Sequence, residues 1–198
     1  LARTARATVE QVAVSVLNEA FTPNPRNPLG EALVQDNHKR LDGGTATNFI
    51  GNLQLSESNL EIAMKLAGEQ VDERGIKIQM APDTLVVPRS LEFTAEKIVK
   101  SVHIPMAGGN TEAQYGPNDI NPMQGRFKVV VLDYLTDDGR WFLIDSKMNP
   151  LNFFWRERLN FKGTNDFDTD VAKYKGRFRI SVGWTDWRGI LGANPNAA

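Results

Sequence analysis

Residues 80–102, MAPDTLVVPRSLEFTAEKIVKSV, predict a buried strand, a proline-bounded turn and a helix that begins at once. The strand is indicated by Leu85–Val87, a short apolar run rich in β-branched residues. Pro88 bounds the turn, because proline has no N–H to donate to a neighbouring strand. Apolar residues then recur at three- and four-residue spacing, which places them on one face of a helix over residues 90–101. These residues are Leu91, Ala95, Ile98 and Val99. The stretch carries packing information and no catalytic motif.

Two more helices are predicted by the same spacing. The first covers residues 4–21, where apolar residues form one stripe and a proline-rich stretch follows. The second starts near Ser56 or Ser58, since Ser58 and Glu61 fit a capping box, in which side chains satisfy free N–H groups of the first turn. Gly75 is placed to end this helix. Both stripes indicate helices that pack on a core.

The clearest hairpin is predicted at residues 127–145. Phe127–Leu135 and Trp141–Asp145 are strand-like and flank a turn at Asp137–Gly139. Apolar residues stand on both faces of the first strand, which is typical of a strand in the middle of a sheet. The sequence therefore predicts two paired neighbours here, one of them central.

Shorter strands are predicted at Lys77–Met80, Phe153–Trp155 and Phe178–Trp184. The segment GTNDFDTDVAKYKG, residues 163–176, is polar and is interpreted as turn-like. With the helices, these strands indicate an α+β fold.

Two long loops are predicted from their Pro, Asn and Gly content. One covers residues 22–52 and holds at most a short strand at Ala32–Val34, and the other covers residues 103–125. Loops of this length in compact domains are often functional.

The composition describes an ordinary globular chain without a broad basic surface. Its 198 residues suit one large domain or two small lobes, with 41% hydrophobic and 24% charged residues. A formal net charge of −1 argues against a protein that grips nucleic acid over a wide face. Seven cations near the C-terminus can touch phosphate, but solvated strand faces are the favoured interpretation. They are Arg156, Arg158, Lys162, Lys173, Lys175, Arg177 and Arg179.

Several functional classes lack their usual residues. The chain has no cysteine, which removes disulfides, thiolate metal sites and a cysteine nucleophile. No apolar run approaches the ~20 residues that span a bilayer, and the N-terminus has no apolar signal core. Leu1 is not an initiator methionine, so the chain is expected to be processed, trimmed or partly represented.

Candidate catalytic residues are few. His38 can act as a base beside Asp36 or Asp42, but a lone histidine in loop-like sequence is more often a surface hydrogen-bonding residue. The sequence GGN at residues 108–110 lacks the spacing of a phosphate loop. No catalytic, cofactor-binding or metal-ligating residue is assigned.

A cluster of carboxylates leaves one hydrolase alternative open. Asp166, Asp168 and Asp170 alternate, with Glu157 upstream. Such oxygen ligands open a calcium loop, but the required glycine and closing glutamate are absent, so solvated turn residues are favoured. Paired carboxylates also serve in hydrolases, at separations that a sequence does not show.

The four tryptophans divide into two groups. Trp141, Trp155 and Trp184 lie in strand-like sequence, where bulky aromatic residues normally fill a core. Trp187, in WTDWRG, is the least easily buried and is interpreted as an interface anchor.

Taken in order, these segments resemble the Mu-like major head subunit of tailed phages and prophages, a branch of the capsid proteins with the Johnson fold. The resemblance covers nearly the whole chain and depends on the order and spacing of the segments together. They are VLNEAF (16–21), DNHKRLDGG (36–44), TNFIGN (47–52), residues 55–101, VVVLDYLTDDGRWFLID (129–145) and YKGRFRISVGWTDWRGILG (174–192).

The resemblance implies two lobes. A peripheral lobe, with a spine helix and a sheet, would comprise residues 1–55 and 151–198. An axial lobe would comprise residues 56–150, with the loop at 103–125 projecting towards a capsomer axis. In this fold an N-terminal arm and an extended hairpin, the E-loop, precede the spine helix, and both are expected to be absent from this chain.

The resemblance also implies partners and a location. The subunit would bind copies of itself in pentamers and hexamers of an icosahedral shell around double-stranded DNA, contacting DNA weakly and without sequence specificity. Scaffold or protease, portal and decoration proteins would be further partners, no cofactor would be needed, and no membrane would be involved. The protein would be made in the bacterial cytoplasm and end in the virion. An encapsulin-like compartment shell and a small carboxylate-dependent hydrolase are the alternatives.

Overall fold

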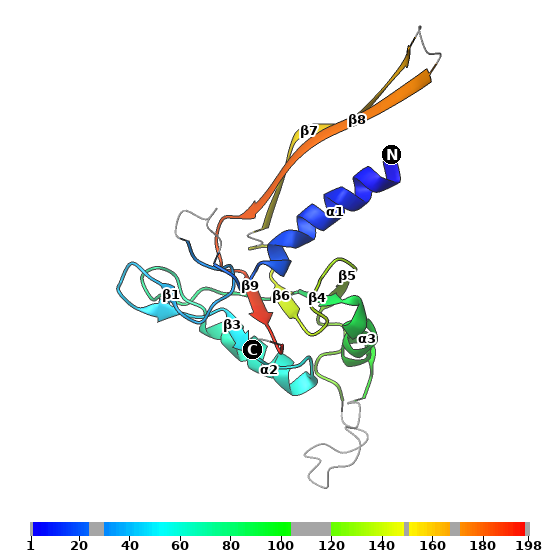
Figure 1. Cartoon of the computed structure of the whole chain (residues 1–198). Helices are drawn as coiled ribbons and strands as arrows, with labels where there is room; N and C mark the ends of the chain where they lie inside the picture. Colours follow the sequence, from blue (N-terminus) through cyan, green and yellow to red (C-terminus); the bar gives the residue numbers. More distant parts are fainter. Residues whose placement is uncertain (1, 24–29, 104–119, 149–150, 167–170, 197–198) are drawn as a thin grey trace.

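A five-stranded mixed sheet forms the centre of the molecule, and a long helix and a long hairpin extend together from one side of it (Figure 1). The structure is a computed structural model and describes residues 2–23, 30–103, 120–148, 151–166 and 171–196. We call the sheet with its covering helices the body, and the helix with the hairpin the arm.

The central sheet combines parallel and antiparallel pairs in the order β3-β9-β6-β4-β5. β4 pairs in parallel with β5 and antiparallel with β6, β6 pairs antiparallel with β9, and β9 pairs in parallel with β3. β6 and β9 are buried along their whole length, as expected for strands covered on both faces. The strands are β3 (Phe49–Gly51), β4 (Thr84–Pro88), β5 (Lys128–Leu132), β6 (Trp141–Ile144) and β9 (Ile190–Ala193).

The predicted hairpin at residues 127–145 is wrong, although both of its strands exist. β4 lies between β5 and β6, so that Leu85 faces Val129 on one side and Leu143 on the other. β5 is consequently an edge strand rather than a central one. The physical reason is that Leu85 and Val87 are fully buried, and a strand inserted between two others satisfies its backbone groups on both sides.

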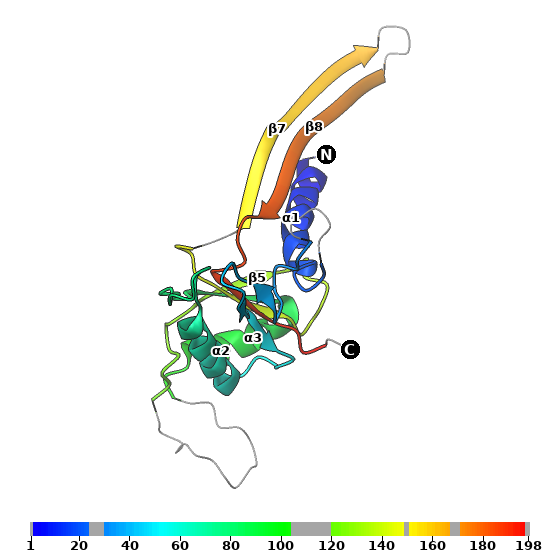
Figure 2. The same cartoon turned by 90° about the vertical axis from the view of Figure 1, so that its left-hand side faces the viewer.

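Helices cover one face of the sheet and the end of the arm covers part of the other (Figure 2). α2 (Glu57–Glu69) and α3 (Glu92–Lys100) bury Leu60, Ala63, Ala95 and Ile98 in a core shared with the β4 side chains Leu85 and Val87. On the opposite face, the C-terminal turns of α1 (Ala2–Asn18) pack in a second core. This core holds Val14, Leu17, Leu33, Val34, Val86, Phe142 and Ile144.

The arm consists of α1 and two long antiparallel strands, β7 (Leu151–Asp166) and β8 (Val171–Trp184). Strands of this length extend roughly 45–50 Å. The interpretation of residues 163–176 as a turn is therefore wrong, because all of them except 167–170, which lie outside the described residues, belong to the two strands. The polar residues in β8 alternate with apolar ones, which is a strand pattern.

Smaller differences concern the ends of elements. Ser56 caps α2, since its hydroxyl accepts from the Asn59 N–H at 3.2 Å, and the helix ends at Glu69. Gly75 instead lies in the following turn, with a φ of 78°. Lys77 forms only an isolated bridge with Val71, so no strand runs over 77–80.

The first predicted loop is more ordered than its composition suggests. Ala32–Val34 is buried without forming a strand. Two short antiparallel strands follow it, β1 (His38–Lys39) and β2 (Thr45–Ala46). Of the second predicted loop, residues 104–119 lie outside the described residues, and His103 and Ile120 form a bridge where it leaves and re-enters the body.

Candidate interaction surface

The hairpin of the arm is an amphipathic ribbon. Side chains alternate between the two faces of a strand, and β8 follows this alternation without interruption. We call one side the apolar face, which in β8 holds Tyr174, Phe178, Ile180, Val182 and Trp184. The other side, the basic face, holds Lys173, Lys175, Arg177 and Arg179.

Strand β7 adds to both faces in register with β8. Phe153 pairs with Val182, Trp155 with Ile180 and Phe161 with Gly176, so these three aromatic residues share the apolar face, whereas Lys162 pairs with Lys175 on the basic face. Between Trp155 and Asn160 the register shifts twice, and β7 accommodates two extra residues there. Such bulges bend and twist a ribbon. Because β7 has an even number of extra residues here, the residues beyond the bulges stay on the same face as before.

Helix α1 covers part of the apolar face. Figures 1 and 2 show α1 running alongside β8. Phe178, Ile180 and Val182 are half-buried, whereas Arg177 and Arg179 between them are exposed. The helix therefore lies on the apolar side of β8 and leaves the basic face open to solvent.

Four aromatic side chains of the apolar face remain largely uncovered, and we call them the aromatic band: Phe153, Trp155, Phe161 and Tyr174. Their exposed fractions lie between 37% and 71%. The rings of Phe153 and Trp155 meet edge to face with centroids 5.2 Å apart. The other two rings cover the glycines opposite them in the ladder. Exposed aromatic side chains gathered on one face of a ribbon are typical of an interaction site.

The basic face places like charges opposite one another. Lys162 and Lys175 are directly paired across the strands, and both are exposed. Arg177 forms an ion pair with Glu157 at 2.9 Å. The face therefore presents positive charge along the strand with one carboxylate among its described side chains.

The carboxylates of the hydrolase alternative do not form a site among the described side chains. Glu157 is held by Arg177 on the open ribbon. Asp166 ends β7, while Asp168 and Asp170 lie outside the described residues. Within the described part of the chain, no group of three or more His, Asp or Glu residues is placed to hold a metal ion.

Asn48 fixes the junction where the chain returns from the arm to the body. Its side-chain Nδ2 donates to the carbonyl groups of Leu33 (2.8 Å), Trp187 (3.2 Å) and Ile190 (3.2 Å). Its Oδ1 accepts from the Gln35 N–H at 3.0 Å. Asn48 is fully buried, so these bonds hold together segments that are far apart in sequence. No local signal distinguishes this residue from other asparagines in the predicted loop.

His38 and Trp187 lie beside Asn48, and both differ from the sequence-based interpretation. Their rings stack with centroids 4.2 Å apart and an interplanar angle of 4°. His38 is fully buried rather than on the surface, and Trp187 is buried rather than available as an interface anchor. The exposed tryptophan is instead Trp155, in the aromatic band.

The partners of His38 define its protonation. Nε2 lies 3.1 Å from Asn48 Oδ1, an acceptor, so Nε2 carries the proton and donates. Nδ1 lies 3.2 Å from Gln35 Nε2 and 3.3 Å from Glu31 Oε2, so it accepts from Gln35 in the neutral ring and donates to Glu31 in the protonated ring. Burial lowers the pKa of His38, against an opposing effect of Glu31. The ring is bonded to Glu31, Gln35 and Asn48 rather than to Asp36 or Asp42.

Arg188 ties the same junction to the turn after α2. Its guanidinium lies over the Trp187 ring at 4.2 Å, pairs with Glu73 at 2.7 Å and donates to the Val71 carbonyl at 3.1 Å. These partly buried contacts attach the base of the arm to the body.

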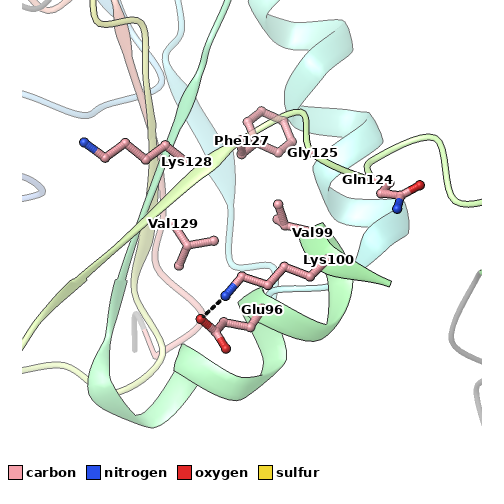
Figure 3. A pocket seen from close by; sticks show the side chains of 8 residues that line it. All are labelled: Glu96, Val99, Lys100, Gln124, Gly125, Phe127, Lys128 and Val129. Atoms are coloured by element: carbon pink, nitrogen blue, oxygen red, sulfur yellow. Dashed lines mark hydrogen bonds and ion pairs between the residues drawn. The ribbon is translucent and has the colours of Figure 1, made fainter. Parts of the chain in front are cut away.

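A hollow of about 450 Å³ lies between α3 and the start of β5 (Figure 3). The one dashed interaction in it joins Lys100 to Glu96 at 2.6 Å on the same helix. Lys128 points away from the centre of the hollow. Val99 and Phe127 supply apolar lining, and no cluster of polar groups converges there among the lining residues.

Comparison with known proteins identifies the family. A family model described as phage capsid protein matches residues 1–193. No curated protein matches the chain. Among the described residues, no helix has the length and apolar character needed to cross a membrane. Because the family model spans nearly all of the chain, the protein belongs to the phage capsid protein family, whose members are structural components of the virion.

Proposed function

We propose that this chain is the major head subunit of a Mu-like phage or prophage and has the Johnson capsid fold. Copies of it assemble into pentamers and hexamers of an icosahedral shell around double-stranded DNA. The observation that carries this proposal is the arm, because a chain that worked alone would have no reason to expose the aromatic band.

The architecture supports two lobes with revised bounds. The peripheral lobe is the arm, α1 with β7 and β8, and the axial lobe is the body. The sequence-based division put β3 and β9 with the arm, but both pair within the central sheet. The chain therefore enters the body after α1, leaves it at β7 and returns at β9.

Rings of five and six require heterologous contacts, in which one surface of a subunit meets a different surface of the next. The arm extends beyond the body and offers such a surface, while contacts of Asn48 and Arg188 attach its base to the body. By the same resemblance, the loop predicted at residues 103–125 would project towards the capsomer axis.

The remaining partners follow from this role. Scaffold or protease, portal and decoration proteins would meet the same subunit during assembly in the host cytoplasm, and the finished shell would contact DNA without sequence specificity.

Electron microscopy of the full-length protein tests the proposal. Rings or closed shells are expected. Strictly monomeric protein at high concentration, with the body folded, would contradict it.

A further inference from the structure

Positive charge is concentrated on the hairpin of the arm. Between residues 151 and 184 the sequence contains seven Lys and Arg residues against four Asp and Glu, although the whole chain has a net charge of −1. The charge is therefore unevenly distributed, and the near-neutral total conceals a local basic surface.

The basic face orders its charges in a row. Lys173, Lys175, Arg177 and Arg179 stand two residues apart on β8, so neighbours are separated by about 7 Å and the row is about 20 Å long. Lys162 adds a second cation directly across from Lys175. Like charges directly opposite in a ladder destabilise the pair, so this arrangement is costly for the isolated chain.

Two arginines of the body each have two carboxylate partners. Arg89 is paired with Asp133 at 2.7 Å and Glu92 at 2.8 Å, and Arg188 is paired with Glu73 and Asp186. On the basic face, Glu157 is paired with Arg177. An external anion that repeats along a line would relieve the repulsion between Lys162 and Lys175.

We propose that the basic face binds the phosphodiester backbone of nucleic acid without reading its bases; the inference rests on the proposed function only for the presence of DNA inside the shell. Lysine and arginine rows neutralise phosphates and release counterions, which gives sequence-independent binding. A neighbouring protein is a poorer fit, because protein interfaces are depleted of lysine. The aromatic band points to the opposite side, so both surfaces can be occupied together.

The test measures binding of the full-length protein to a short DNA duplex and to a single strand of equal length over a range of salt concentrations. Each cation that neutralises a phosphate makes the slope of log K against log salt more negative by about 0.9 for the duplex. Lys162→Gln with Lys175→Gln should reduce the slope by about 2 and weaken binding at low salt. The melting temperature should stay equal or rise, because a repulsive pair is removed.

A matched control removes the same charge elsewhere. Lys65 on α2 and Lys97 on α3 are exposed, and Lys65→Gln with Lys97→Gln should leave the slope unchanged. Equal weakening by both double variants would overturn the site in favour of net charge. The site would also be overturned if the double variant at Lys162 and Lys175 bound DNA as tightly as wild type. A double variant that lost self-association but kept its DNA affinity would overturn it as well. A preference for duplex or for single-stranded DNA that disappears in the double variant supports the site. It also identifies which form of DNA the basic face binds.

Electron microscopy of the same preparations separates this inference from the proposed function. Shells that form normally while the wild-type protein shows no salt-dependent DNA binding would overturn the phosphate site alone. DNA binding that depends on Lys162 and Lys175, in a protein that never forms shells, would support the site and overturn the proposed function.

Discussion

Phe161 on β7 lies directly opposite Gly176 on β8, and its ring fills the space beside the glycine where a side chain would stand. A β-carbon at position 176 would lie 2.8 Å from the Phe161 ring. Tyr174 covers Gly163 in the next pair on the same face. Aromatic residues that cover a glycine across a ladder fix the register of a ribbon.

Phe161→Ala should loosen the distal hairpin. The loss of a cross-strand aromatic contact is expected to cost about 0.5–1 kcal/mol. Hydrogen exchange of the β7 and β8 amides should become faster, with the body unchanged. Phe154→Ala is the matched control, because Phe154 stands on the basic face opposite Ser181 and is more exposed. Equal acceleration in both variants would argue against the role of the Phe161 ring.

Asn48→Ala should destabilise the whole protein. The change removes the side-chain donor to three carbonyl groups and leaves buried polar groups unsatisfied, at an expected cost of about 2–4 kcal/mol. Chemical denaturation gives the measurement. The exposed Asn52 provides the control, and Asn52→Ala should change the free energy of unfolding by less than about 0.5 kcal/mol. Similar changes in the free energy of unfolding for the two variants would contradict the role of Asn48 in holding the junction together.

Stability should fall as the pH drops from about 7 towards 5, because of His38. Burial lowers its folded-state pKa below the unfolded value of 6.5, so the unfolded chain takes up the proton first. The contribution of neutral His38 to the free energy of unfolding is fully present above pH 6.5 and is lost as the pH falls towards the folded-state pKa. Glu31, Gln35, Asn48, Trp187 and Arg188 face the ring and set the size of the effect.

Melting temperatures of wild type and His38→Gln across this range check the prediction. The variant should be less stable at pH 7 and show a flatter profile. His103→Gln, which replaces the other histidine of the chain, should leave the wild-type profile intact. A wild-type profile that is flat between pH 7 and 5 would contradict the assignment.

Local patterns predicted the helices, and non-local pairing explains most of what they missed. The stripes of α1, α2 and α3 are visible in sequence because helix periodicity involves residues three and four apart. β5 and β6 are equally visible, but β4 comes between them from forty residues upstream, which spacing within 127–145 cannot reveal.

The junction and the arm were harder to predict for the same reason. His38 stacks on Trp187, about 150 residues away, so neither residue shows its burial in its own neighbourhood. Strands are predicted at Phe153–Trp155 and Phe178–Trp184, but residues 163–176 between them are interpreted as a turn because they are polar. The regular alternation over residues 173–184 is the signal that identifies the strand, and also the basic face.

Electron microscopy of full-length Phe153→Ser with Trp155→Ser tests whether the aromatic band joins subunits into a shell. Phe93→Ser is the control, because Phe93 is 80% exposed on α3 in the body. We expect shells from wild type and Phe93→Ser, and folded but unassembled subunits from the double variant. Shells of normal size and yield from the double variant would contradict this expectation.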